Sequence, residues 1–279
     1  MQICDAHNDL LMNLHSKAEI QSYLTKFCNN NKVVKIFTAY YVSQNQEKCW
    51  TVGEILNDMH KKFCLIEDMP QCVPTMENIG FVDNFCTLEQ VIKLKPFCVS
   101  LTWNFDNKIA GGAFGQNGIS EFGREVINIL EGNKILIDTA HLNKKSFMEF
   151  ADLTKYPILC THTSSKEVYN IPRAIDSEQM KIIMQSNGLV GLCLYSTLLS
   201  DRRTTNKDIL KHINSFLENL DLKNIGLGTD FNATGECNPV GYDIDYNGVP
   251  HLLEMVKKRY GTKFCRMFAG ENLQRMLCI

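Results

Sequence analysis

The sequence lacks three features that would each point directly to a class of protein. Its 279 residues carry a formal net charge of only −2 and no long basic tract, so nucleic acid and anionic membrane surfaces are not expected as partners. No run of about 18 apolar residues occurs, which excludes an ordinary transmembrane helix. No early segment joins a charged start to a long apolar core, so we expect a cytoplasmic protein.

The sequence also lacks the paired cysteines of metal-binding ribbons. Its 12 cysteines are scattered along the chain, and no two of them are spaced as C-x-x-C. In a chain that is 44% hydrophobic and 22% charged, such cysteines are typical of small buried side chains or free thiols. Cys160 and Cys193 lie in apolar runs and are expected in the core. A cysteine-rich zinc regulator is therefore disfavoured.

Short apolar runs alternate with longer stretches of helical period along the chain. The runs predict eight strands, at residues 1–4, 33–42, 71–76, 96–103, 134–140, 156–162, 188–196 and 224–230. The stretches between them predict helices at residues 51–63, 87–94, 120–132, 144–155, 177–187 and 206–220. Near-continuous apolar strands need helical cover on both faces, as in parallel sheets. The pattern predicts a (β/α)8 TIM barrel in one domain, 1–279, with two further helices at 249–261 and 263–276 covering its outside.

Polar residues suited to metal binding stand where the predicted strands end, which is where barrel enzymes place their chemistry. These residues are His7, Asp9, Glu77, His141, His162 and Asp230. Each has an ordinary alternative when taken alone, such as a hydrogen-bonded histidine, a solvated loop acid or an aspartate that caps a loop. Their convergence on one rim favours a shared divalent metal, with Asp230 as the group that moves a proton.

Other titratable residues are given structural roles. The remaining histidines lie in helical stretches or near loop starts, and we expect them at the surface: His15, His60, His212 and His251. Asp138 stands three residues before His141. It is expected either to support a metal ligand or to make a structural hydrogen bond.

Seven segments, in this order, resemble the renal (membrane) dipeptidase family of the amidohydrolase superfamily. They are "DAHNDLL", "MENIGF", "LTWN", "FGREVINIL", "ILIDTAHL", "THTSSKEVYNIPRAI" and "GLGTDFN". The similarity extends over nearly the whole chain. It implies a TIM barrel that holds two zinc ions and hydrolyses dipeptides through a metal-bridging hydroxide, including dipeptides with a D-residue at the C-terminal position.

The same resemblance implies a role for each matching residue. His7 and Asp9 would bind one zinc ion, His141 and His162 the other, and Glu77 would bridge both. Asp230 would be the catalytic acid that handles the proton and contacts substrate. Arg173, in "NIPRAI", would hold the terminal carboxylate of the peptide, a task that suits the forked guanidinium. A homodimer is expected on the same ground.

Two departures from the family pattern fall in the expected substrate pocket. Trp103, in "LTWN", stands where well-known members carry a histidine that contacts the substrate carbonyl, and an indole N–H donates a hydrogen bond but does not titrate. The usual "DFDG" is "DFNA" here, with Asn232 and Ala233. The chain shows no secretion or lipid-anchor signal, so we expect an intracellular microbial relative.

Three functions are therefore weighed. The first is a zinc dipeptidase acting on short peptides, with other divalent transition metals as alternatives to zinc. The second is another metal-dependent hydrolase of the same superfamily, such as an N-acyl amino-acid amidase. The third is a barrel that has lost catalysis and serves as a binding protein, which the presence of all five expected metal ligands disfavours.

Overall fold

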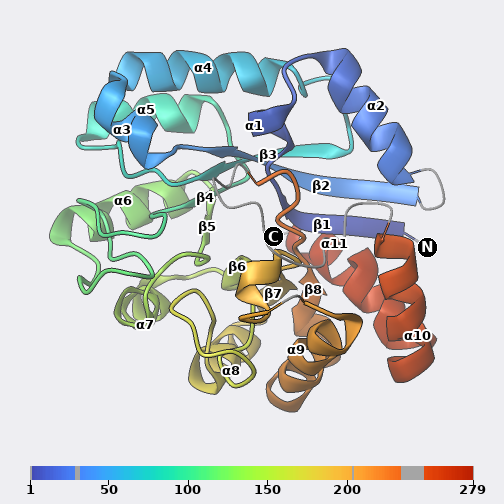
Figure 1. Cartoon of the computed structure of the whole chain (residues 1–279). Coiled ribbons are helices and arrows are strands. Elements are labelled where there is room, and N and C mark those ends of the chain that lie inside the picture. Colours follow the sequence, from blue (N-terminus) through green and yellow to red (C-terminus); the bar gives the residue numbers. More distant parts are fainter. Residues whose placement is uncertain (1, 29–31, 203, 234–247, 279) are drawn as a thin grey trace.

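Eight parallel strands pair in sequence order, β1 to β8, and helices surround them (Figure 1). The structure is a computed structural model that describes residues 2–28, 32–202, 204–233 and 248–278. The strands are β1 (Gln2–Asn8), β2 (Lys32–Tyr41), β3 (Cys72–Glu77), β4 (Cys98–Ser100), β5 (Leu136–Asp138), β6 (Leu159–Thr163), β7 (Leu189–Leu192) and β8 (Ile225–Leu227). The predicted TIM barrel is confirmed.

Eleven helices are described, and all but the last, α11, lie around the outside of the barrel (Figure 1). They are α1 (Leu10–Asn13), α2 (Lys17–Cys28), α3 (Gln44–Cys49), α4 (Val52–Cys64), α5 (Phe85–Lys93), α6 (Glu121–Gly132), α7 (Lys144–Leu153), α8 (Ser177–Gln185), α9 (Asn206–Asn219), α10 (Val249–Arg266) and α11 (Asn272–Met276). Short helical turns are η1 (Ser196–Leu198), η2 (Leu222–Asn224) and η3 (Met267–Glu271). Among these described helices, none combines the length and the apolar character that crossing a bilayer requires.

Helix starts follow the capping chemistry of the sequence. Thr51 and Glu54 form a capping box at the start of α4, and Asp176 and Gln179 form one at α8. Helices α1, α2 and α3 are not predicted by the apolar period. The sequence of α3 is polar throughout, and it begins at the capping box of Ser43 rather than at an apolar stripe.

The barrel closes between its first and last strands. Asn8 and Phe231 form a parallel bridge, the backbone N–H of Asp230 donates to the carbonyl of His7 at 3.0 Å, and the N–H of Asp9 donates to Phe231 at 2.8 Å. These bonds lie just beyond the end of β8, so β1 and β8 meet most closely at the carboxyl rim. The closure brings together residues that are more than two hundred positions apart in the chain.

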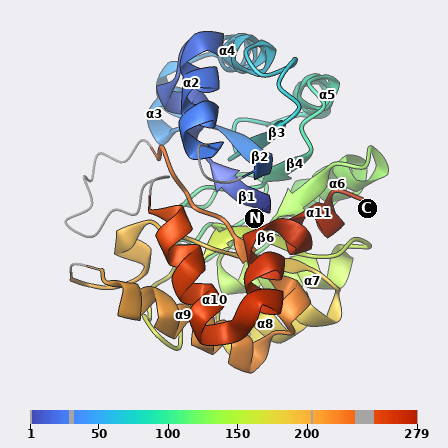
Figure 2. The ribbon, with the colours of Figure 1, turned by 90° about the vertical axis from the view of Figure 1, so that its right-hand side faces the viewer.

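The C-terminal helices do not lie only on the outside, which corrects the prediction for residues 263–276. The barrel interior holds a cluster of buried side chains from β1 to β7, and Leu273 and Met276 of α11 belong to this cluster. Figure 2 shows α11 beside the N-terminal end of β1, and the side chain of Gln274 bonds to that of Gln2 at 3.2 Å. Helix α11 therefore covers the end of the barrel opposite the carboxyl rim.

Candidate metal centre

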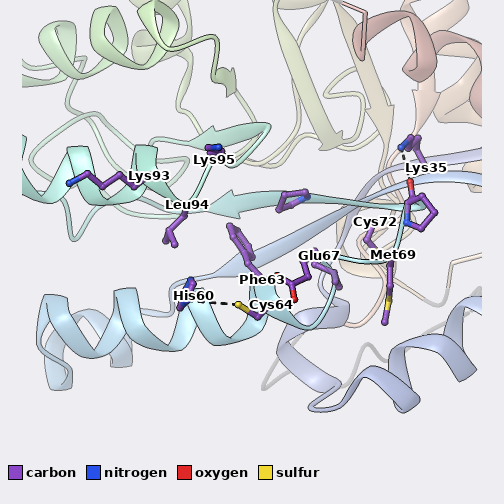
Figure 3. A pocket seen from close by; sticks show the side chains of 13 residues that line it. Lys35, His60, Phe63, Cys64, Glu67, Met69, Cys72, Lys93, Leu94 and Lys95 are labelled. Atoms are coloured by element: carbon purple, nitrogen blue, oxygen red, sulfur yellow. Dashed lines mark hydrogen bonds between the residues drawn. The ribbon is translucent and has the colours of Figure 1, made fainter.

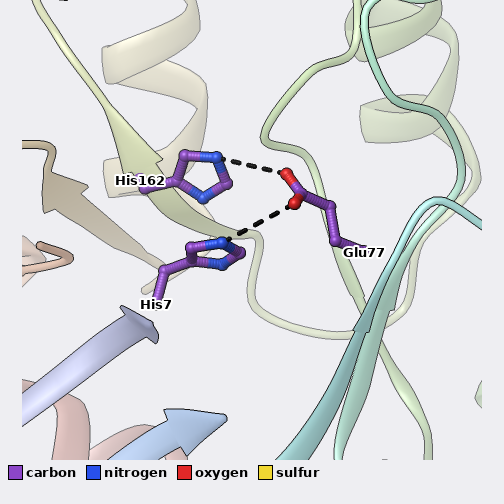
Figure 4. Close-up of side chains that lie close together, drawn as sticks. All are labelled: His7, Glu77 and His162. Carbon is purple, nitrogen blue, oxygen red and sulfur yellow. Dashed lines mark ion pairs between the residues drawn. The ribbon is translucent and has the colours of Figure 1, made fainter. Parts of the chain in front are cut away.

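Three predicted ligands from β1, β3 and β6 point toward one another at the carboxyl rim (Figure 4). One carboxylate oxygen of Glu77 lies 3.5 Å from Nε2 of His162, and the other lies 3.8 Å from Nε2 of His7. The rings of His7 and His162 are 3.8 Å apart between centroids. All three side chains are buried. The carboxylate of Glu77 therefore faces two different histidines with its two oxygens, as a bridging ligand would.

His141 completes one half of this cluster. Its Nε2 lies 2.6 Å from Oε1 of Glu77 and 3.0 Å from Nε2 of His162. Strand β5 ends at Asp138, and the chain then turns so that His141 adopts a left-handed backbone with φ of 72°. This turn directs the imidazole over the rim toward the neighbouring strand.

Two further carboxylates surround His7. Asp9 Oδ1 lies 3.3 Å from Nε2 of His7, and Asp230 Oδ1 lies 3.9 Å from the same nitrogen. Asp230 also has a left-handed backbone, with φ of 60°, at the turn after β8. Among the described residues, two groups have ligand atoms close enough to share a metal ion. One is His7 with Glu77 and His162, and the other is His7 with Asp9 and Asp230.

Hydrogen bonds on the far side of two imidazoles decide which nitrogen faces the cluster. Nδ1 of His141 lies 3.0 Å from Oδ1 of Asn104, and Nδ1 of His162 lies 2.9 Å from Oγ1 of Thr161. With each Nδ1 donating its proton, the two Nε2 atoms face each other at 3.0 Å with lone pairs directed inward. Only a proton or a cation between them relieves that repulsion.

In the other half of the cluster, buried polar atoms without hydrogen-bond partners also indicate a place for a cation. Among the described residues, Nε2 of His7 and Oδ1 of Asp9 are buried and have no hydrogen-bond partner, because the 3.3 Å approach between them does not have hydrogen-bond geometry. Buried polar atoms are normally bonded, so both atoms call for a ligand. Imidazole nitrogens and carboxylate oxygens in this number fit a divalent transition metal such as zinc.

Burial and charge shift the ionisation of these groups strongly. Burial lowers the pKa of His141 and of His162 well below the ordinary value. Burial also opposes the charged form of His7, but the adjacent carboxylates of Asp9 and Glu77 outweigh it and raise the pKa of His7 to about 10. Burial raises the pKa of Asp230 to about 7. Three carboxyl groups, those of Asp9, Glu77 and Asp230, thus lie around His7.

The other two predicted substrate residues, Arg173 and Trp103, lie beside the cluster. Arg173, in the loop after β6, is 8% exposed, and its Nη2 has no hydrogen-bond partner among the described residues. Burial raises the pKa of Glu77, and the positive charge of Arg173 opposes that shift. The indole of Trp103 stacks on the ring of His141 with 5.9 Å between ring centroids, and it lies against the ring of Tyr41 with 5.1 Å between centroids. Both side chains are thus placed near the metal ligands.

Some contacts of the cluster were not anticipated from the sequence. Asn104 contacts His141, and the thiol of Cys193, a core residue as predicted, donates to Oδ2 of Asp230 at 3.4 Å. Asn104 adjoins Trp103 in "LTWN", but nothing in that segment indicates which histidine it contacts. Asn232, one of the two departures, has a left-handed backbone and donates its side-chain amide to Asn8 at 2.8 Å.

The prediction that His212 lies at the surface is wrong. His212 is fully buried in α9, where its Nδ1 accepts from the backbone N–H of Ser165 at 3.1 Å and its Nε2 donates to the carbonyl of Leu199 at 3.0 Å. Burial lowers the pKa of His212, which keeps the ring neutral. The other three histidines, His15, His60 and His251, are exposed as expected.

A hollow on the side of the barrel is separate from this cluster. It has a volume of about 440 Å³ and lies between α4, the loop that follows it and the start of β3, as Figure 3 shows. Its lining includes His60, Cys64 and Lys95, and none of the rim residues described above. The candidate metal centre is therefore not part of this hollow.

The fold and the rim cluster define a class of protein. An eight-stranded barrel with buried imidazoles and carboxylates at its carboxyl rim is typical of metal-dependent hydrolases. The model of the membrane dipeptidase family (peptidase family M19) matches residues 33–279. The chain belongs to that family.

Individual relatives are more distant. A Klebsiella pneumoniae protein, described as an uncharacterized protein in the pqqA 5' region, is 25% identical over 168 residues, which are 56% of this chain and 61% of the relative. An uncharacterized dipeptidase of Schizosaccharomyces pombe is 25% identical over 195 residues, 66% of this chain and 46% of the relative. The matches thus span about half to three fifths of these two relatives.

A solved structure shares the fold. It is a metallopeptidase from Rhodobacter sphaeroides, liganded with a phosphinate mimic of the dipeptide L-Ala-D-Ala. The TM-score is 0.77 at 18% identity, and the match covers 98% of this chain and 97% of that one. At this identity the likeness supports the barrel architecture.

Proposed function

We propose that this protein is a zinc-dependent dipeptidase that hydrolyses the peptide bond of short peptides. Two zinc ions would be held at the rim, one by His7 and Asp9 and the other by His141 and His162, with Glu77 bridging both. The observation that carries this proposal is the arrangement around Glu77, where Nε2 of His141 lies beside one carboxylate oxygen and Nε2 of His7 faces the other. When bound, the ions would supply Lewis acidity to the scissile carbonyl and acidify a water molecule so that it attacks near neutral pH.

Asp230 would be the residue that moves the proton. Its Oδ2 is held by the thiol of Cys193, which leaves Oδ1 facing the cluster 3.9 Å from His7. Burial keeps the pKa of Asp230 high for a carboxyl group, at about 7, which suits a group that accepts a proton and later donates it to the departing amine.

Arg173 would select peptides with a free C-terminus. Its buried Nη2 has no partner among the described residues, so an incoming carboxylate can accept hydrogen bonds there without displacing an existing bond. The dipeptide class is further supported by the family to which the chain belongs and by the dipeptide mimic in the Rhodobacter sphaeroides metallopeptidase. We include peptides with a C-terminal D-residue in the proposed range.

Trp103 favours a second candidate, an N-acyl amino-acid amidase. The indole ring stacked on His141 presents an apolar face beside the metal ligands. Such a face accommodates an acyl group as readily as the first residue of a peptide. Both candidate substrates keep the free carboxylate that Arg173 would bind, so the two functions differ only on the acyl side of the scissile bond.

Hydrolysis assays on zinc-loaded protein separate these functions. Protein stripped with a chelator and reloaded with zinc is expected to bind two ions per chain by elemental analysis and to cleave L-Ala-L-Ala or L-Ala-D-Ala. Asp230→Asn, which preserves shape, is expected to bind zinc but to lose hydrolysis. Cleavage of N-acetyl-alanine without cleavage of any dipeptide would establish the second function, and protein that binds no metal would overturn both.

We also propose that the protein works as a homodimer in a reducing, cytoplasmic setting. The 12 cysteines are scattered along the chain with no paired C-x-x-C spacing, which suits a compartment that keeps thiols reduced. Light scattering on the purified protein tests the dimer. Localisation by fluorescence microscopy of a tagged chain in its native cells tests the compartment.

A further inference from the structure

Two buried aspartates behind the rim cluster share three hydrogen bonds of the same kind at two places in the barrel, and Asp5 also accepts the side-chain amide of Asn8 at 3.2 Å. Asp5 of β1 accepts the backbone N–H and the hydroxyl of Thr229 at 2.7 and 2.5 Å. Asp138 of β5 accepts the backbone N–H and the hydroxyl of Thr161 at 2.9 and 2.5 Å. The first pair joins β1 to the turn after β8, and the second joins β5 to β6. The same device thus occurs twice in the barrel.

Each aspartate also holds its own strand end. Asp5 accepts the N–H of His7 at 3.3 Å, and Asp138 accepts the N–H of Ala140 at 3.0 Å. Both side chains are buried, and no described lysine or arginine forms an ion pair with either. A buried carboxylate is costly unless hydrogen bonds compensate for its lost hydration. A barrel that needed only packing here would hold apolar side chains.

The threonines stand directly before residues of the metal centre. Thr161 precedes His162, and Thr229 precedes Asp230. Each aspartate therefore fixes two rim segments at once: its own, which continues to His7 or His141, and that of the neighbouring strand. This geometry ties the positions of four cluster side chains to two carboxylates.

The pair at β5 and β6 also acts on an imidazole ring. Oγ1 of Thr161 lies 2.5 Å from Oδ2 of Asp138 and 2.9 Å from Nδ1 of His162. A carboxylate only accepts hydrogen bonds, so the hydroxyl gives its single proton to Asp138 and must accept from Nδ1–H of His162. The ring is thereby held in the tautomer whose Nε2 lone pair faces Glu77. Glycines make room for this threonine, because a Cβ at Gly191 or Gly228 would collide with its carbonyl oxygen.

At the other pair the hydroxyl acts on backbone instead. Oγ1 of Thr229 gives its proton to Asp5 and accepts the N–H of Phe231 at 3.2 Å. These bonds bracket Asp230 on both sides and define the left-handed turn from which its side chain projects. The two aspartate–threonine pairs therefore make the same hydrogen bonds, but one orients the imidazole of His162 and the other orients the turn that carries Asp230.

We propose that Asp5 and Asp138 are positioning residues of the metal centre, each acting through a threonine of the adjacent strand. Asp138 and Thr161 fix the tautomer and direction of His162, and Asp5 and Thr229 fix the turn that carries Asp230. The inference rests on the proposed function for its catalytic part. Its metal-binding part needs only that the cluster binds zinc.

Threonine variants test the first pair without removing a buried charge. Thr161→Val keeps the shape and removes the hydroxyl, Thr161→Ser restores the hydroxyl, and Thr75→Val is a matched control because Oγ1 of Thr75 is buried and has no partner among the described residues. We expect Thr161→Val to weaken zinc binding about 10- to 100-fold in chelator competition, as loss of a group that orients a metal ligand does. Thr161→Ser and Thr75→Val are expected to bind zinc as the wild type does.

A second readout separates positioning from general loosening of the barrel. The visible absorption of cobalt-loaded protein is expected to change in Thr161→Val but not in Thr75→Val, while both variants keep cooperative thermal unfolding. If Thr161→Val changes neither the zinc affinity nor the cobalt spectrum, the proposed role of Asp138 is overturned. Equal weakening by Thr75→Val would also overturn it, because the effect would then be a matter of packing.

The second pair is tested by turnover. Thr229→Val is expected to lower kcat about 10-fold or more at nearly unchanged KM, with Thr229→Ser recovering most of the loss. Unchanged kcat would overturn the role of Asp5. If wild-type protein binds two zinc ions but cleaves no dipeptide, the proposed function fails, while zinc affinity in the Thr161 variants still decides the inference about Asp138.

Discussion

Replacing Arg173 by methionine tests whether the metal centre is built to read a free carboxylate. The side chain is 8% exposed, and its Nη2 lacks a partner among the described residues. A substrate carboxylate bound there would accept two charge-assisted hydrogen bonds from the guanidinium. Methionine fills a similar volume without any donor, so the substitution removes the charge and both hydrogen bonds while leaving the site packed.

The size of the effect follows from the chemistry of the contact. A hydrogen bond to a charged group contributes about 1.5 to 3 kcal/mol, and two of them share one geometry, so the loss is about 3 to 4 kcal/mol. That corresponds to a decrease of about 10²- to 10³-fold in kcat/KM. Wild-type enzyme should therefore prefer a dipeptide over its C-terminal amide by about this factor. Arg173→Met should reduce the preference to less than about 10-fold.

The assay measures the ratio of kcat/KM for two substrates on each protein. Steady-state kcat/KM is measured for Ala-Ala and Ala-Ala amide on zinc-loaded wild type, Arg173→Met and Arg173→Lys, with bound zinc determined for each. The lysine variant keeps a point charge and should retain part of the preference. A methionine variant that loses activity equally on both substrates, or that still prefers the free carboxylate by 100-fold, would refute the assignment.

Further predictions concern the proposed bridging acid Glu77, the indole of Trp103 and Asp208, which is the buried third residue of α9 and forms a capping box with Thr205. Glu77→Gln removes the charge that would bridge the two proposed zinc sites. We expect elemental analysis to show that bound zinc falls to one ion per chain or fewer. Two tightly bound ions would contradict a bridging role. Trp103→Phe keeps the stacking on His141 but removes the indole N–H. If that N–H donates to the reacting carbonyl, kcat should fall about 10-fold. An unchanged kcat would exclude the contact. Although burial alone would raise the pKa of Asp208, hydrogen bonds from Arg202 and Thr205 hold it well below its usual range. Asp208→Asn should therefore destabilise the protein by about 1 to 2 kcal/mol in urea unfolding at pH 6, and the difference should shrink below about pH 4, where the unfolded carboxyl takes up a proton; a difference that grows at acid pH would contradict this cause.

Much of the architecture can be predicted from the sequence because it depends on the local pattern of apolar and polar residues. Eight apolar runs with intervening helical periods predict eight strands, and the structure has them. The histidines and acids that end these runs predict a rim cluster, because parallel strands must bring their carboxyl ends to one edge. Strand ends are less well predicted. The run 188–196 stays apolar beyond the pairing of β7, since Cys193 and Leu194 remain buried after the strand ends at Leu192.

Other features depend on partners that are distant in sequence. His212 looks like a surface residue because it lies in a helical stretch directly after Lys211, yet its ring is buried where α9 packs against the loops that hold Ser165 and Leu199. The C-terminal helices read as outer cover, and only the closed barrel shows that Leu273 and Met276 fill its end. Periodicity reports which face of a helix is apolar, but it does not report which cavity that face will fill.

The sequence alone determined the order of the barrel units and the types of residue at their ends, since both follow from the period of apolar residues and the chemistry of the side chains. The tertiary structure decided how those residues are aimed. Asp5 meets Thr229 across 224 positions, and Asp138 reaches Nδ1 of His162 through Thr161. Such contacts depend on the register and closure of the barrel, because hydrogen bonds form only between groups that the fold brings within about 3 Å at the right angle.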